Sequence, residues 1–187
     1  MNRYLRLLLV WLRARRSAHA PSAPTPGSPL GEYRTTLRVM PNDIDLLRHV
    51  NNGAYLTLLD IGRVDMTLRS GAQSALDARG WFPVVVGESI RFRRSMTLWE
   101  RFTIVTRVLG WDERVIYLDQ RFERTGRDGA VEVVAEAWVV ARFLARSGGT
   151  VPSPEVAALF GLDPVSPPLP DAVVTWARAL DLAHRAV

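Results

Sequence analysis

The spacing of apolar and polar residues changes along this chain, and each spacing predicts a different kind of element. Residues 33–40 are rich in β-branched and aromatic types, which predicts a strand that Pro41 ends. From Asn52 to about residue 70, apolar residues cover most of a helical surface, so we expect a long helix enclosed by the rest of the domain. A shorter helix is expected near residues 72–78, and Gly80 ends it.

After Gly80 the apolar residues alternate with polar ones, which is the pattern of strands. Strands are expected at residues 81–94, 102–111, 114–124 and 130–145, with a bulge at Gly87 and a hairpin turn at residues 126–129. Two helical patterns follow in the tail, one beginning at Ser153 and the other covering about residues 170–185.

This order predicts an α+β fold in which a curved antiparallel sheet of about five strands wraps one long central helix. Helix and sheet bury each other's apolar faces, and the meander of strands supplies the wall. A sheet of long strands also has free edges, which a second copy of the chain could cover.

The N-terminal segment has a different character, because residues 3–16 predict an amphipathic basic helix. Its unbroken apolar run, residues 7–12, is much shorter than the roughly 20 residues of a membrane-spanning helix. Three interpretations stay open: the helix lies on an anionic membrane surface, it docks on the body or on a partner subunit, or it is a signal peptide. A helical wheel places Arg3, Arg6, Arg13 and Arg16 on one side, and on the other Tyr4, Leu5, Leu8, Trp11 and Leu12.

Residues 17–30 contain four prolines among alanine, serine and glycine, and this composition predicts a linker. The chain is therefore divided into an N-terminal helix (1–16), a linker (17–30), the α+β domain (31–148) and a helical C-terminal extension (149–187).

Composition narrows the chemistry. The 187 residues are 48% hydrophobic and 23% charged, which predicts a packed core; the net charge is a modest +5 and no nucleic-acid-binding module is visible. The absence of cysteine excludes disulfides, thiolate metal sites and cysteine nucleophiles. The three histidines, His19, His49 and His184, lie in different segments, and no Gly-x-Ser-x-Gly elbow exists. Carboxylates and amides remain as the reactive groups.

Residues 41–55 bring several polar side chains into one short span, Pro-Asn-Asp-Ile-Asp-Leu-Leu-Arg-His-Val-Asn-Asn-Gly-Ala-Tyr. The span joins the first predicted strand to the long helix, and Asn51 or Asn52 is suited to cap that helix. It places Asp43 and Asp45 just before the helix N-terminus, where free backbone N–H groups are available. A carboxylate beside such groups is chemically useful.

The element order, with Asp43-x-Asp45 and His49-Val50-Asn51-Asn52-x-x-Tyr55, resembles the hotdog-fold thioesterases of the 4-hydroxybenzoyl-CoA thioesterase type over residues 33 to about 145. Segments 41–47, 91–95 and 108–114 are similar to one subgroup, the thioesterase superfamily member six proteins and their bacterial relatives. The resemblance implies a homodimer with sheets joined edge to edge, or a stacked tetramer, with active sites at the subunit interface. Membrane-associated N-termini occur in that subgroup.

Within this resemblance, Asp45 matches the family's catalytic carboxylate, and Asn52 with Gly53 matches the helix start whose amides receive the thioester oxygen. Those amides would stabilise the developing oxyanion. Asp45 would act as general base for water, or attack directly to form a mixed anhydride, and both roles stay open. The structural alternative is that Asp45 only fills a turn or caps the helix, and Asp43 is interpreted as loop architecture.

The remaining polar residues of the motif have two interpretations each. Asn51 and Asn52 are expected to divide the work of capping the helix and of fixing the thioester or a water. His49 would shuttle a proton, or its imidazole would bond to the loop backbone. Asp60 is a reserve carboxylate, or simply the ion-pair partner of Arg63 three residues later; many relatives have glutamate at its position.

Basic residues and one tyrosine complete the expected substrate contacts. Arg91, Arg93 and Arg94 are interpreted as ligands of the phosphates of coenzyme A, with a solvated strand face as the alternative. Tyr55 belongs to the motif, and Arg48 stands where many relatives have glycine, which is expected to change the loop around the thioester.

We therefore expect an acyl-CoA thioesterase that uses no metal or bound cofactor, coenzyme A entering only as part of the substrate. Two alternatives remain open: a non-catalytic hotdog module that binds acyl groups at a membrane surface, and a hotdog hydratase or dehydratase using His49. The expected partners are acyl-CoA, further copies of the chain and, through residues 3–16, a membrane surface, but not nucleic acid. A cytoplasmic location is expected, with or without peripheral membrane contact.

Overall fold

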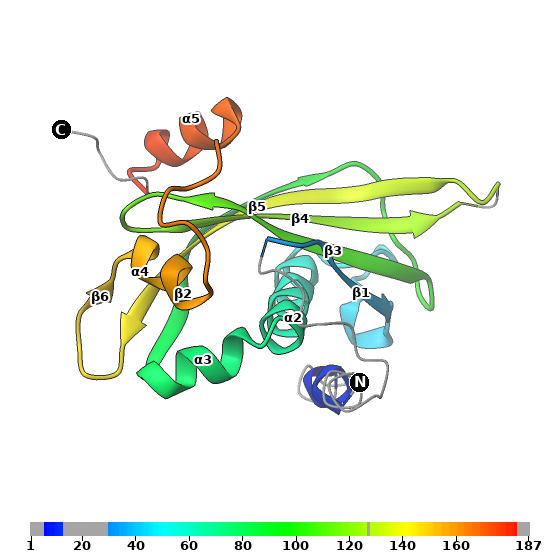
Figure 1. The fold of residues 1–187 in the computed structure, drawn as a ribbon. Coiled ribbons are helices and arrows are strands. Elements are labelled where there is room, and N and C mark those ends of the chain that lie inside the picture. The colour runs from blue at the N-terminus through cyan, green and yellow to red at the C-terminus, as the bar shows by residue number, and fades with distance from the viewer. Residues whose placement is uncertain (1–5, 13–29, 127, 183–187) are drawn as a thin grey trace.

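The structure, a computed structural model, describes residues 6–12, 30–126 and 128–182. At its centre lies the helix α2, Asn52–Arg69, which a curved antiparallel sheet covers on one side (Figure 1). The strands follow the order β1-β3-β4-β5-β2, and β6 pairs with β5. Their bounds are β1 Tyr33–Arg38, β2 Trp81–Phe92, β3 Arg101–Trp111, β4 Ile116–Thr125, β5 Val131–Ala145 and β6 Thr150–Val151. The predicted α+β arrangement is confirmed.

The shorter helices lie around this core. The 3-10 helix η1, Pro41–Asp43, leads from β1 toward α2, and α3, Ala72–Arg79, follows α2. In the tail, α4 covers Ser153–Leu159 and α5 covers Asp171–Ala179. Figure 1 shows α5 on the face of the sheet opposite to α2, so the tail reaches both sides of the sheet.

The helix α2 is buried because its apolar residues face the concave side of the sheet. Leu58, Leu59 and Ile61 are fully buried and belong to the same core cluster as Ile104 of β3. Gly62 brings the helix close to the sheet, since a Cβ at this position would lie 2.9 Å from side-chain atoms of Ile104 and Thr106. Gly62 therefore allows the helix to approach the side chains of the sheet closely.

Residues of β5 alternate between the two faces of the sheet. Val139 packs toward α2 in a cluster with Met66, whereas Trp138 lies on the outer face, with its ring 5.9 Å from that of Trp176 in α5. The predicted bulge in β2 is present, since the register shifts between Val85 and Gly87. The two-residue strand β6 was not predicted, because Thr150 and Val151 are too few to show a period.

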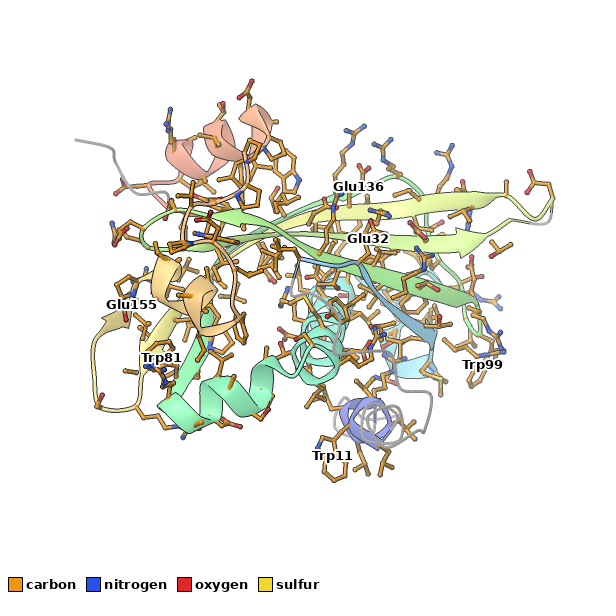
Figure 2. The ribbon with its side chains drawn as sticks, viewed as in Figure 1. Trp11, Glu32, Trp81, Trp99, Glu136 and Glu155 are labelled. Carbon is orange, nitrogen blue, oxygen red and sulfur yellow. The ribbon has the colours of Figure 1, made fainter. Side chains whose placement is uncertain are left out.

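Residues 6–12 form a helix that packs against the body of the protein. Val10 is 2% exposed and joins the core cluster around α2. The opposite side of this helix is open to solvent, and Figure 2 shows Trp11 turned away from the sheet. Docking on the body is therefore the interpretation that the structure supports. Exposed apolar residues on the open side are Leu8, Leu9, Trp11 and Leu12.

Several sequence expectations fall outside the described residues, among them the linker up to Pro29, the hairpin residue Arg127 and the two terminal histidines, His19 and His184. Within the described part of the chain, no helix is both long enough and apolar enough to span a membrane.

Candidate active site

Asp45 holds a tight turn together. Its backbone N–H donates to the carbonyl of His49 at 2.9 Å, and the N–H of Arg48 donates to the carbonyl of Asp45 at 3.0 Å. Its carboxylate atom Oδ1 accepts the backbone N–H groups of Leu47 at 2.9 Å and His49 at 3.3 Å. For Oδ2 we find no partner among the described residues. One oxygen of the Asp45 carboxylate, Oδ1, therefore stabilises the turn, while the other, Oδ2, is available to a ligand.

The turn forces Arg48 into the left-handed backbone region, with a φ of 64°. Glycine adopts this region at little cost, whereas a residue with a Cβ is strained there. This geometry agrees with the glycine that the family resemblance led us to expect at this position. The side chains at the tip of the turn point into solvent, and Leu46 is 101% exposed and Leu47 76% exposed.

The first turn of α2 provides backbone donors beside Asp45. Asn51 is the N-cap residue, and its Oδ1 accepts the N–H of Gly53 at 2.8 Å. The carbonyl of Asn51 accepts the N–H of Ala54 at 2.9 Å. No acceptor for the N–H of Asn52 is found in residues 6–12, 30–126 and 128–182. Because the cap already occupies Gly53, the expected pair of oxyanion donors is reduced in this structure to Asn52.

Asp43 has a structural role, as expected, but its partner was not foreseen. It is 3% exposed, and its carboxylate accepts two hydrogen bonds from the guanidinium of Arg6, at 2.9 and 2.6 Å. It also accepts the backbone N–H of Met40 at 2.8 Å, and its own carbonyl accepts the N–H of Asn51 at 2.7 Å. Asp43 therefore ties the N-terminal helix to the loop that carries Asp45. The wheel placed Arg6 on a polar face, but at 3% exposure it is buried.

His49 and Tyr55 differ from their predicted environments. The main chain of His49 forms hydrogen bonds with Asp45, as described above. Its imidazole is exposed and has no hydrogen-bond partner in the described part of the chain. The expected bond from the ring to the loop backbone is therefore not seen among the described residues. Tyr55 is 2% exposed and lies in the core, edge-on to Phe92 and Phe122 with ring centres 5.0 Å apart. Burial raises the pKa of Tyr55 to about 12. In this structure Tyr55 is therefore a core residue, and its contact with substrate stays a prediction.

The expected ion pair inside α2 is confirmed, since Arg63 Nη2 lies 2.5 Å from Oδ1 of Asp60. The same guanidinium also donates to Gln120 Oε1 at 2.8 Å and lies 2.8 Å from Oε1 of Glu88. The side chain of Arg63 is only 13% exposed, whereas that of Asp60 is 51% exposed. Asp60 thus presents a fixed carboxylate on the open face of the helix. Sequence spacing gave no signal for Glu88 or Gln120, which come from β2 and β4.

The three arginines at the end of β2 and just beyond it do not behave alike. Arg93 pairs with Glu136 at 2.7 Å, and Arg94 pairs with Glu132 at 3.1 Å. Glu136 lies on the outer face of the sheet (Figure 2). Arg91 is exposed, and none of the residues that the structure describes forms an ion pair with it. Arg93 and Arg94 thus fit the solvated strand face, and Arg91 keeps its donors for a ligand.

A cavity of about 310 Å³ lies beside α2, and Asp60 and Arg63 are part of its lining. Residues from α2, α3, the sheet and the segment around α4 line it. Neither in this cavity nor elsewhere do the described residues contain a group of three His, Cys, Asp or Glu side chains that could hold a metal ion.

Residues 39–177 match the thioesterase-like superfamily. This chain belongs to that superfamily. The protein THEM6 of Xenopus laevis is 35% identical over 152 residues, which cover 81% of this chain and 70% of the relative. The hotdog thioesterase family recognised from residues 41–55 is thereby confirmed, and so is the prediction of a thioester hydrolase.

Solved structures of thioesterases share the fold. The probable thioesterase YbaW from Escherichia coli has a TM-score of 0.61 and 24% identity, covering 67% of this chain and 94% of that one. A mutant 4-hydroxybenzoyl-CoA thioesterase in complex with 4-hydroxybenzoyl-CoA has a TM-score of 0.62 and 18% identity, covering 68% and 97%. The predicted hotdog arrangement, with its central helix in a curved sheet, is confirmed.

Proposed function

We propose that this protein hydrolyses the thioester bond of an acyl-CoA, with Asp45 as the reacting carboxylate. The observation that carries the proposal concerns two groups close in the sequence, Asp45 Oδ2 and the backbone N–H of Asn52. Neither atom has a partner among the described residues, and the two are joined by one short turn before α2. A carboxylate oxygen and a helix N-terminal donor are the two groups that thioester hydrolysis needs.

In this mechanism the thioester oxygen accepts a hydrogen bond from Asn52, and the dipole of the 18-residue helix α2 favours the negative charge that develops there. Asp45 then removes a proton from water as the water attacks the carbonyl carbon. Alternatively, Asp45 attacks that carbon itself to form a mixed anhydride, which water then hydrolyses to the free acid and the Asp45 carboxylate. The two backbone bonds to Oδ1 fix the orientation of the carboxylate in both routes. The leaving group is the thiolate of coenzyme A, which water or a neighbouring acid protonates.

The superfamily assignment supports the reaction, and the structure solved with 4-hydroxybenzoyl-CoA supports coenzyme A as the carrier of the acyl group. His49 would have to act through its ring in a hydratase, together with an acid. In this chain its contact with Asp45 is made by the main chain, so the hydratase alternative has no support from the geometry.

The test compares two isosteric substitutions under one assay of thiol release from acyl-CoA. Asp45→Asn keeps an oxygen acceptor for the turn but removes the base, so kcat should fall by roughly 10²–10⁴-fold. Asp60→Asn serves as the matched control in the same helix-and-loop unit and should change kcat by less than about tenfold, since Asp60 is an ion-pair partner. If Asp60→Asn abolishes turnover and Asp45→Asn keeps it, the reserve carboxylate is the catalyst and this assignment fails.

Arg91 and Arg48 are proposed as contacts for the phosphates of coenzyme A. Both are exposed cations, and neither guanidinium has an acidic partner among the residues that the structure describes. Arg91→Ala should raise KM with little effect on kcat, because a phosphate contact contributes equally to ground state and transition state. Arg93→Ala is the control, since Arg93 is already paired with Glu136; an equal rise of KM in both variants would contradict the proposal.

We also propose that the protein acts as a homodimer joined through the free edge of β2. This edge strand has 12 residues and pairs with β5 on one side only. Apolar side chains near it are exposed, namely Val85 on the strand and Leu56 and Val64 on α2. A long unpaired edge of this kind favours pairing with a second strand. Light scattering should give twice the monomer mass, and a monomer at micromolar concentration would contradict the dimer.

Peripheral membrane contact is proposed for the open side of the N-terminal helix. A helix with exposed apolar residues and flanking arginines in the sequence fits an anionic lipid surface. Because deletion of the helix would also remove Arg6, the test uses the surface substitutions Trp11→Ser and Leu12→Ser. Binding to anionic vesicles should fall in both; unchanged binding would refute the membrane contact.

A further inference from the structure

The cavity beside α2 is larger than the packing of a domain core requires. Its volume of about 310 Å³ reaches the range of ligand sites, roughly 300–1,000 Å³. Most of its wall is apolar, with Val64 and Met66 from α2 and Ala141 and Phe143 from β5. The polar residues of the wall lie on α2 and α3, and two of them, Asp60 and Arg63, are bound to each other.

The wall of the cavity changes from open to closed along its length. Asp60 and Val64 belong to the exposed side of α2, so this end is the mouth. Val156 and Ala157 of α4 also line the cavity and are only 1% and 2% exposed, so we interpret their side of the wall as the closed end. Phe160, just after α4, also lines the cavity. The C-terminal extension therefore forms the closed end.

An exposed stripe of α2 leads from the candidate active site toward the mouth. Gly53, Leu56, Asp60 and Val64 are exposed residues of α2, spaced three or four apart, and form one stripe along the helix. At about 1.5 Å of rise per residue, the stripe runs roughly 16 Å from the first turn of the helix to the cavity. An extended chain that starts at the N-terminus of α2 can follow this stripe.

We infer that this cavity binds the apolar end of a straight-chain acyl group, and that Ala157 and Phe160 determine how long that group can be. The inference rests on the proposed thioesterase function for the identity of the substrate's head group. It holds for an acyl-CoA bound at the α2 N-terminus of the same copy or of a second copy.

The volume and the lining both favour an aliphatic chain. In another protein a dry apolar cavity of roughly 150 Å³ binds benzene, and at that ratio about 310 Å³ holds roughly twelve carbon atoms. A hydroxylated aromatic acyl group would carry its hydroxyl toward Val156 and Ala157, whose side chains offer no hydrogen bond. Leaving such a hydroxyl unpaired weakens binding by roughly tenfold.

Two substitutions change the closed end in opposite directions. Ala157→Leu adds three carbon atoms inside the cavity, and Phe160→Ala removes a ring. Because each buried methylene changes affinity by roughly fourfold, loss of room for three should reduce the preference for the longest chains by up to roughly sixtyfold. Ala158→Leu is the matched control, since Ala158 is the exposed neighbour and does not line the cavity.

The experiment measures thiol release from straight-chain acyl-CoA substrates, from butanoyl to hexadecanoyl, and from 4-hydroxybenzoyl-CoA. In parallel, calorimetry measures binding of the free carboxylates of the same series to the full chain. We expect the optimum to move to shorter chains in Ala157→Leu, to longer chains in Phe160→Ala, and to stay in Ala158→Leu.

The possible outcomes separate the two proposals. Hydrolysis with an optimum that moves in neither Ala157→Leu nor Phe160→Ala overturns the cavity assignment and leaves the thioesterase intact. Chain-length-dependent binding that moves as expected, without any hydrolysis, supports the cavity and refutes the reaction. A preference for 4-hydroxybenzoyl-CoA over all straight chains also overturns the inference. If Ala157→Leu does not fold, the shift in Phe160→Ala decides.

Discussion

The ion pair between Arg6 and Asp43 should control the stability of the loop that carries Asp45. The side chains of both residues are only 4% exposed, and Arg6 also donates to the carbonyl of Arg38 at 3.0 Å. Arg6→Met keeps much of the apolar stem but leaves the Asp43 carboxylate buried without its cation. Removing one partner of a buried pair typically costs about 3–5 kcal/mol, because the other charge remains uncompensated.

The assays are urea unfolding and thermal unfolding, both followed by the fluorescence of the six tryptophans. For a chain of this size, a loss of about 3–5 kcal/mol lowers Tm by roughly 6 to 20 °C. Arg94→Met is the matched control: its pair with Glu132 has side chains 65% and 37% exposed, so its loss should cost less than about 1 kcal/mol. Asp43→Asn and the double variant with Arg6→Met complete a double-mutant cycle. The double variant should lose about 1–3 kcal/mol less unfolding free energy than the two single variants lose together.

An equal, small effect of Arg6→Met and Arg94→Met would refute the reasoning, because it would mean that Arg6 is exposed in solution. A large effect of Arg6→Met without coupling to Asp43→Asn would refute the pair while retaining a role for the helix. The expected result requires both the large single effect and the coupling.

Three further outcomes follow from backbone geometry, packing and charge. Arg48→Gly should stabilise the protein by about 1 kcal/mol in urea, because it relieves the left-handed backbone; a loss of stability would contradict this. Gly62→Ala should cost about 1–3 kcal/mol, since its Cβ would lie 2.9 Å from side chains of the sheet, and a neutral result would mean that α2 can shift. Burial alone would raise the pKa of Glu123, but hydrogen bonds from Arg121 and Arg34 outweigh it and lower that pKa. Glu123 therefore stabilises the fold above the ordinary pKa of a glutamate, and this contribution is lost as pH falls through the lowered pKa. In Glu123→Gln, the unfolding free energy should not show this loss on acidification, and acid unfolding curves identical to those of the unsubstituted protein would contradict the prediction.

Local patterns were sufficient for the elements that form the core. The long helix was expected to begin at Asn51 or Asn52 and observed to begin at Asn52, because an asparagine cap followed by an all-round apolar pattern is a local signal. The bulge at Gly87 was also predicted from the strand sequence alone. Elements fixed by longer-range pairing were predicted less accurately. The strand expected over residues 81–94 ends at Phe92, because the backbone N–H groups of Arg93 and Arg94 both donate to the carbonyl of Val134 and the regular ladder stops.

The candidate site was predicted less completely than the fold, for a physical reason. The position of Asp45 before the helix is local and was identified, but its partners Leu47 and His49 depend on a turn conformation that the sequence does not specify. Arg6 lies 37 residues from Asp43, and a helical wheel cannot show which side of a helix a distant carboxylate will cover. Tyr55 was assigned to substrate from the motif, yet its neighbours in the core come from strands far along the chain.

The helix α5 of the C-terminal extension keeps the protein soluble by covering apolar residues on the outer face of the sheet. Tyr117 and Val140 on the outer sheet face are buried in the same cluster as residues of α5, and Trp138 packs against Trp176. Without α5 these residues would form an exposed apolar patch, and aromatic side chains alone contribute about 150–250 Å² each. A shortened version of this thioesterase that ends near residue 148 would therefore expose an apolar surface that promotes aggregation. Such a version would need polar substitutions at Tyr117, Trp138 and Val140 to remain soluble.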